Sequence, residues 1–335
     1  MLNENTESVF QETNSRLHLA VFGKHPCWND HMEDLGLTTP SLIQFKRRLY
    51  YEGISGRLDC GAWRDLAPES RIETFDHQLL WTGQTGVIFA VLWHSADGGG
   101  RAAYPMVAAA HFLTSRLPAK AGPVFEALEQ VADDCRHAQD REAVAQAQTH
   151  GLDRLIQAAR ALVPLSAQTW NREERETFLN HASFGEGGDG FARLFYAFTE
   201  YQNLHGSTKN TFCYRVTDGG AEAEALTIWQ TLMRAQMDTS HSLLAVRCRQ
   251  QTWVDLLAGE FPSEEFFRLK AKAQEIPLVT DIPYQVPDEL KEQTRMVLES
   301  FLESPELIPK LGDCGSDGPG QSTLSSLLGK IFRKK

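Results

Sequence analysis

Short runs of consecutive apolar residues recur along the first third of the chain and predict buried strands. Residues 87–93 are apolar throughout, and residues 106–113 are nearly so; residues 17–22 and 75–81 are of similar length. Apolar runs of this length, bounded by Gly, Pro or Asp, are typical of strands in the core of a sheet. We expect 87–93 and 106–113 to form a hairpin around a loop that carries three consecutive glycines.

Elsewhere the apolar positions recur every three or four residues, which predicts amphipathic helices. The predicted helices cover 39–52 (with Lys46, Arg47 and Arg48 on the exposed face), 123–162, 173–181, 191–204, 226–237, 253–269 and 288–303. Two further short segments, 211–216 and 241–248, are predicted to be strands. Because strands and helices interleave, we expect a mixed α/β fold, with one layered domain in which helices flank a central, largely antiparallel sheet.

Changes in composition divide the chain into four parts. Residues 1–16 are polar and without periodicity, and we expect a disordered lead-in before the α/β domain of residues 17–275. Pro277, Pro283 and Pro287 then mark the start of a helical extension over 276–310. Residues 311–335 begin with a Gly-rich flexible linker and end in a basic amphipathic tail.

The tail combines an apolar stripe with a strongly basic end. The stripe residues occur at i, i+3, i+4, i+7 and i+8, and basic residues follow among and after them: Leu324, Leu327, Leu328, Ile331 and Phe332, with Lys330, Arg333, Lys334 and Lys335. A basic amphipathic segment of this kind docks in the groove of a partner protein or lies on an anionic membrane surface. Folding back onto its own domain is the third alternative.

Charge and cysteine content narrow the function classes. The chain has 33 basic and 44 acidic residues and a net charge of −11, which argues against nucleic-acid binding. The six cysteines are far apart, no apolar window could span a membrane, and the first residues lack the order of a signal peptide. We therefore expect a cytoplasmic protein, with peripheral contact at the inner face of the membrane through residues 322–335 as an open alternative.

The glycine-rich loop offers two interpretations. In the first, Asp97 caps the turn through its own backbone; in the second, Asp97 pairs with Arg101 and makes the loop a rigid recognition surface. The Gly-rich segments 97–100 and 185–190 match neither phosphate-binding pattern, so we expect no nucleotide and no other cofactor.

A metal site is the main catalytic alternative. The residues that could gather around zinc or iron in a metal-dependent hydrolase are His25, Asp30, His31 and His77. The sequence has no GxSxG elbow and no evident pair of acid and base carboxylates. We therefore favour the expectation that no metal is bound and that the protein is not an enzyme.

Several short motifs occur in a fixed order. They are a strand followed by Gly23-Lys24-His25-Pro26 with Trp28 and Asp30 close behind, then Gly61-Ala62-Trp63, and then Ser95, Asp97, Gly100, Arg101 and Pro105. With the strand at 243–247 and the segment 262–266, they resemble the TagF (ImpM) family of type VI secretion-associated proteins, or a close sister group. The resemblance covers residues 18–275. The chain departs from the family pattern at Asn29-Asp30-His31, in its extra loop glycine and in its basic tail.

The resemblance implies a non-enzymatic regulator. Members of this family restrain the assembly or firing of a secretion system through protein contacts, notably with forkhead-associated partners in a kinase–phosphatase pathway. The resemblance supplies no catalytic residue. It implies that the motif residues from Gly23 to Pro105 form a structural and interaction surface, with the tail as a second docking element.

Overall fold

The computed structural model describes residues 16–114, 117, 120–161, 170–182, 189–203, 212–237, 241–259, 262–281, 285–305 and 307–311. The predicted tail and its linker lie outside the described residues, as does nearly all of the predicted lead-in.

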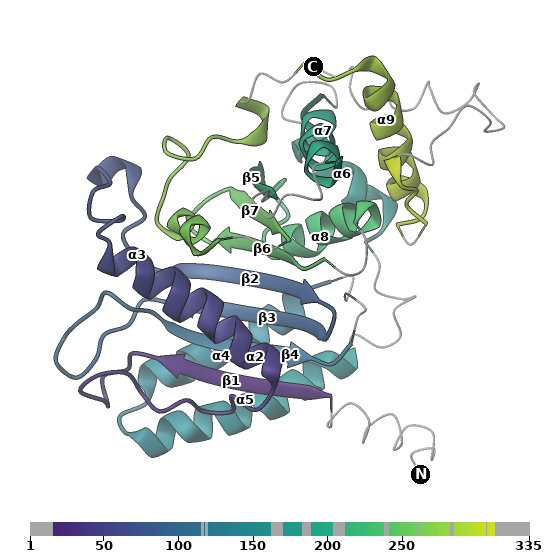
Figure 1. Cartoon of the computed structure of the whole chain (residues 1–335). Coiled ribbons are helices and arrows are strands. Elements are labelled where there is room, and N and C mark those ends of the chain that lie inside the picture. The colour runs from purple at the N-terminus through teal and green to yellow at the C-terminus, as the bar shows by residue number, and fades with distance from the viewer. Residues whose placement is uncertain are drawn as a thin grey trace, which may run out of the picture.

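One seven-stranded sheet organises the fold (Figure 1). Its strands are β1 (Leu17–Gly23), β2 (Asp76–Gly83), β3 (Gly86–Trp93), β4 (Met106–Phe112), β5 (Phe212–Thr217), β6 (Leu243–Cys248) and β7 (Trp253–Ala258). Their order across the sheet is β1-β4-β3-β2-β6-β7-β5, and every neighbouring pair is antiparallel. The predicted mixed α/β fold with an antiparallel sheet and flanking helices is confirmed.

Helices cover both faces of this sheet (Figure 1). On one face lie α4 (Gly122–His137) and α5 (Arg141–Ala161), which pack against β1, β3 and β4. On the other face α2 (Pro40–Lys46) continues into the π-helix η1 (Arg47–Ser55) and the short α3 (Gly56–Asp59). Alternate residues of each strand point to opposite faces. Val21 therefore contributes to the core beneath α4 and α5, and Phe22 to the core beneath α2 and η1.

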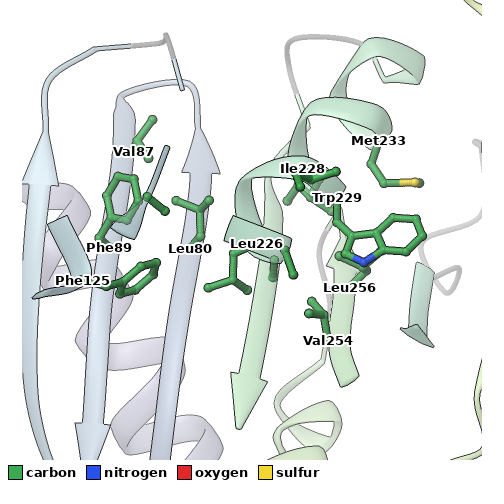
Figure 2. Packing of buried hydrophobic residues seen from close by; sticks show 14 of the residues in the cluster. Leu80, Val87, Phe89, Phe125, Leu226, Ile228, Trp229, Met233, Val254 and Leu256 are labelled. Carbon is green, nitrogen blue, oxygen red and sulfur yellow. The ribbon is translucent and has the colours of Figure 1, made fainter. Parts of the chain in front are cut away.

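The remaining helices pack over the β6, β7 and β5 half of the sheet. They are α6 (Arg172–Ala182), α7 (Asp189–Asn203), α8 (Glu224–Gln236) and α9 (Asp288–Glu303). Figure 2 shows Trp229 of α8 lying with Met233 above Val254 and Leu256 of β7. The Trp229 ring also packs edge-on to Phe178 of α6, at 5.4 Å between centroids. The same core continues through Phe89 and Leu80 (Figure 2), so that one apolar layer spans the molecule.

The extension after residue 275 belongs to this layer. Val297 and Phe301 of α9 are fully buried in the main core, and the Phe301 ring lies 6.2 Å from that of Trp170. The short 3₁₀ segments η2 (Pro68–Ser70), η4 (Ser263–Leu269) and η5 (Val279–Asp281) complete the described elements.

Two local predictions are wrong. The predicted helix over 253–269 is strand β7 followed by η4, because β6 and β5 flank this segment and hydrogen-bond to both of its edges. Lys46 is not on an exposed face: its Nζ lies 2.6 Å from Asp34 Oδ2, and the side chain is buried between Asp34 and the ring of Tyr51. The predicted start of this helix is confirmed, since Thr39 Oγ1 accepts a hydrogen bond from the Leu42 N–H at 3.2 Å.

Candidate functional site

The ends of β1 and β4 bring two loops together, and we call residues 23–31 and 95–105 the paired loops. Gly23 and Met106 form the last residue pair between the two strands. The Lys24 N–H then donates to the Pro105 carbonyl at 3.4 Å, and the Gly98 N–H donates to the Trp28 carbonyl at 2.6 Å. Segments about 75 residues apart in sequence are thus joined by backbone hydrogen bonds.

Gly23 makes this approach possible. Its φ is +131°, a conformation that L-residues with a side chain rarely adopt. A Cβ at this position would lie 2.4 Å from the Pro105 carbonyl oxygen and 2.8 Å from Met106 Cα. The motif glycine therefore serves both the backbone angle and the close contact between the loops.

A buried ion pair joins the loops beneath their surface. Lys24 Nζ lies 2.7 Å from Asp97 Oδ2, and the two side chains are 4% and 0% exposed. Asp97 Oδ1 also accepts the backbone N–H groups of Gly99 and Arg101, each at 3.0 Å. The hydrogen bond from Lys24 is the largest cause that holds the pKa of Asp97 well below its usual range, and the N–H of Arg101 adds to it. Asp97 is thus a stable carboxylate, and a weak base.

The turn cap and the Asp97–Arg101 pair that the two interpretations assume are both present, and the recognition role stays a prediction. Asp97 caps the turn through Gly99, and it also pairs with Arg101, whose Nε lies 2.7 Å from Asp97 Oδ2. The partner that sequence reasoning missed is Lys24, 73 residues earlier. Lys24 follows a strand and a glycine, and this local context gives no signal of a distant carboxylate.

At the surface, the same cluster displays an exposed pair. The side chain of Arg101 is 59% exposed, and its Nη2 donates to the Asn29 carbonyl at 2.5 Å. Arg101 Nη2 also lies 3.4 Å from Asp30 Oδ1, and Lys24 Nζ lies 3.3 Å from the same oxygen. The hydrogen bond from Lys24 is the main cause that lowers the pKa of Asp30. Two cations and two carboxylates therefore balance each other, with one pair buried and one exposed.

The aromatic rings of Tyr50 and Tyr104 pack beside the charged cluster. Lys24 Nζ lies 5.1 Å from the centroid of the Tyr104 ring, and His31 packs edge-on against Tyr104 and Tyr50 at 5.1 and 5.7 Å. The Tyr50 hydroxyl donates to the Pro105 carbonyl at 3.2 Å. Burial lowers the pKa of His31, although Asp30 acts in the opposite direction. These two tyrosines hold the loop against η1, and His31 between them stays partly accessible to solvent.

The other motif residues occupy different places. Trp28 is buried in the core, where its ring lies 5.1 Å from the guanidinium carbon of Arg141 at the start of α5, and its carbonyl belongs to the loop contact. Pro26 and Gly100 are exposed, and Ser95 is half-buried. Trp63 is not part of the paired loops: its Nε1 donates to the Phe267 carbonyl at 3.0 Å and anchors η4.

The proposed metal cluster is wrong. His25 Nε2 hydrogen-bonds the Cys135 carbonyl of α4 at 2.8 Å, whereas His31 lies between tyrosines on the opposite face. His77 is on β2, three strands from β1, or about 14 Å at the usual strand spacing. Among the described residues, no group of three His, Cys, Asp or Glu is placed to hold a metal ion.

A buried charged network escaped the sequence analysis. Arg215 of β5 binds Asp255 of β7 through two parallel hydrogen bonds of 2.8 and 2.7 Å, and Arg268 Nη1 lies 3.4 Å from the same carboxylate. Arg215 also donates to the Ala271 carbonyl at 2.9 Å. The sequence does contain one signal of this network, because Arg215 and Asp255 each interrupt a short, otherwise mostly apolar segment. The network ties η4 to the sheet and lies apart from the paired loops.

Comparison of the chain with models of protein families gave no match, and no curated protein matched it significantly. Within the described parts of the chain, no helix has the length and apolar character needed to cross a membrane.

Proposed function

We propose that this protein is a non-enzymatic regulator of a type VI secretion-like system, acting in the cytoplasm through protein–protein contacts of the paired loops. The observation that carries the proposal is the arrangement of Arg101 and Asp30, exposed side by side above the buried Lys24–Asp97 pair. Side chains held in one geometry before binding lose little entropy when a partner arrives. A preformed pair of opposite charges is thus suited to recognition.

The chemistry of the cluster supports recognition more than catalysis. A general base at neutral pH needs a pKa near 7, whereas Lys24 and Arg101 hold the pKa of Asp97 far below that value. Lys24 is itself engaged by two carboxylates. The charged groups therefore neutralise each other, and the surface presents shape and a fixed hydrogen-bonding pattern.

The partners that the motif resemblance implies are components of the secretion system, including a forkhead-associated protein. Regulation would be post-translational, by restraint of assembly or firing. The tail is a second contact in this proposal, supported by its apolar stripe and basic end.

Affinity purification from the native host tests the proposal. We expect the full chain to retain secretion-system components, identified by mass spectrometry, and an Arg101→Ala variant to lose them. Arg172→Ala is the matched control, because Arg172 is also an exposed arginine with a 2.7 Å contact to a carboxylate, that of Glu176. Equal recovery by the two variants would refute the role of the paired loops, and recovery of no such component by the full chain would refute the function.

Deletion of the tail separates the second contact. We expect a 1–311 form to keep the contacts of the paired loops and to lose those of the tail. Sedimentation with anionic vesicles distinguishes the membrane alternative, because tail-dependent binding requires the full chain and 1–311 to differ. Equal sedimentation would exclude a membrane role for residues 322–335.

A further inference from the structure

The outer face of α2 and η1 carries a regular strip of accessible side chains. The residues that are exposed or half-buried on this face come in pairs four positions apart, namely Ile43 and Gln44, Arg47 and Arg48, and Tyr51 and Glu52. We call these six residues the helix strip. Leu42, Phe45, Leu49 and Tyr50, on the opposite side, are buried in the core.

The change from α-helix to π-helix straightens the strip. Four residues slightly exceed one α-helical turn of 3.6 residues, whereas they fall short of one turn of a helix with i→i+5 hydrogen bonds. From Ile43 to Arg47 the four-residue step therefore rotates the side chain slightly past one full turn. From Arg47 to Tyr51, within η1, the same step stops slightly before one full turn. These two rotations about the helix axis are opposite in sign and offset each other, so the three side chains lie along one line on the order of 10 Å long.

The strip has the composition of a binding surface. Ile43 and Tyr51 are 52% and 56% exposed, and they are two of the four exposed large hydrophobic residues in the described part of the chain. Arg47 lies between them and is 74% exposed. Tyr and Arg are the residue types that most often carry the binding energy of protein interfaces.

A notch in the strip is lined by charge. The notch is an open hollow of about 300 Å³, lined by Gln44, Arg47, Arg48 and Glu52. Arg47 Nε lies 2.7 Å from Glu52 Oε1, and Arg48 Nε lies 3.8 Å from Glu52 Oε2. The four lining side chains thus include two guanidinium groups and one carboxylate, and Arg47 is the more exposed of the two arginines. A second carboxylate, supplied by a partner, complements this notch.

We propose that the helix strip docks an acidic peptide segment of a partner protein, with a carboxylate in the notch and apolar side chains against Ile43 and Tyr51. Charge complementarity at the notch and the two apolar positions that flank it carry this assignment. The strip involves different residues from the paired loops, so the inference stands whether or not the proposed function does.

Selection from a phage-displayed library of random 12-residue peptides tests the inference. We expect the full chain to enrich peptides that combine Asp or Glu with apolar residues. A fluorescein-labelled copy of the most enriched peptide should then bind at least tenfold more weakly to Arg47→Glu and to Tyr51→Ala, by fluorescence anisotropy. Its affinity should also fall between 0.05 and 0.3 M salt, because the contact with the notch is exposed and screened.

Two controls make the outcome decisive. Arg172→Glu changes charge equally at an arginine with the same 2.7 Å contact to one carboxylate, and Arg101→Ala alters the paired loops; both should bind the peptide as the unaltered chain does. Urea unfolding verifies that each variant is folded. Enrichment of no acidic peptide, or equal binding by Arg47→Glu, would overturn the inference. Binding of phosphatidylserine vesicles that Arg47→Glu abolishes, without peptide selection, would overturn it as well and assign the strip to anionic lipid instead.

Discussion

Replacement of Gly23 by alanine tests whether the paired loops depend on a close backbone contact. The new methyl group meets two separate obstacles. A φ of +131° costs a residue with a side chain about 1–3 kcal/mol. Contact at 2.4 Å with the Pro105 carbonyl oxygen and 2.8 Å with Met106 Cα forces the backbone apart, and such overpacking costs a further ~1–3 kcal/mol.

Two other glycines separate these contributions. Gly100 has a φ of +78° but open space around it, so Gly100→Ala should cost only the backbone term, about 1–2 kcal/mol. Gly56 is helical, with a φ of −58° and no atom within 4 Å of the place that an added methyl group would take, so Gly56→Ala should stabilise by up to ~1 kcal/mol. The expected order of stability is Gly56→Ala, unaltered chain, Gly100→Ala and Gly23→Ala.

Urea unfolding monitored by circular dichroism measures this order through the transition midpoint and slope. Gly23→Ala should lose about 2–6 kcal/mol, a large part of the ~5–15 kcal/mol by which domains are usually stable. It should also weaken the Lys24–Asp97 contact, since Lys24 follows directly. A loss equal to that of Gly100→Ala would show that the contact with Pro105 is unimportant and would refute the explanation of the Gly23 motif.

Three further predictions concern buried ionisable side chains. Arg215→Met leaves Asp255 buried without its two parallel hydrogen bonds and should cost about 3–5 kcal/mol in urea unfolding, against less than ~1 kcal/mol for the exposed Arg101→Met; equal losses would contradict this account. The folded-state pKa of Asp97 lies below its unfolded value, so its stabilisation is complete above about pH 5 and declines as the pH falls below about 4. Asp97→Asn should therefore show a shallower loss of stability with acid, and an unchanged slope would count against the Lys24–Asp97 pair. Burial, with the charge of Lys270 as a smaller cause, lowers the pKa of His77 to about 3; its ring should remain neutral at pH 5 by nitrogen-15 NMR, and an imidazolium signal there would disprove that burial.

The difference between the predicted and observed elements has local causes. Residues 87–93 were recognisable as a strand because they are apolar on both faces, and β3 is indeed fully buried. The segment from Trp253 was mistaken for a helix because Asp255 interrupts its apolar pattern and gives it a spacing that also suits a helix. Only the neighbouring strands, with Arg215 facing that carboxylate, make it a strand.

The same distinction applies to the paired loops. The turn after β1, the loop after β3 and the capping role of Asp97 follow from short-range chemistry, since Gly, Pro and Asp restrict or bond the backbone within a few residues. Order and spacing of these motifs also predict one shared surface, and the two loops are indeed in contact, while their role in binding stays a prediction.

Which residues meet was decided by the tertiary structure alone. Antiparallel pairing of β1 with β4 brings Gly23 beside Met106, and this register places Lys24 against Asp97 and Arg101 against Asp30. It also sends His25 to the opposite face, away from His31, and leaves His77 three strands distant. Local sequence specifies turns and apolar faces, but contacts between residues 73 positions apart depend on strand order and register, which arise only when the whole sheet forms.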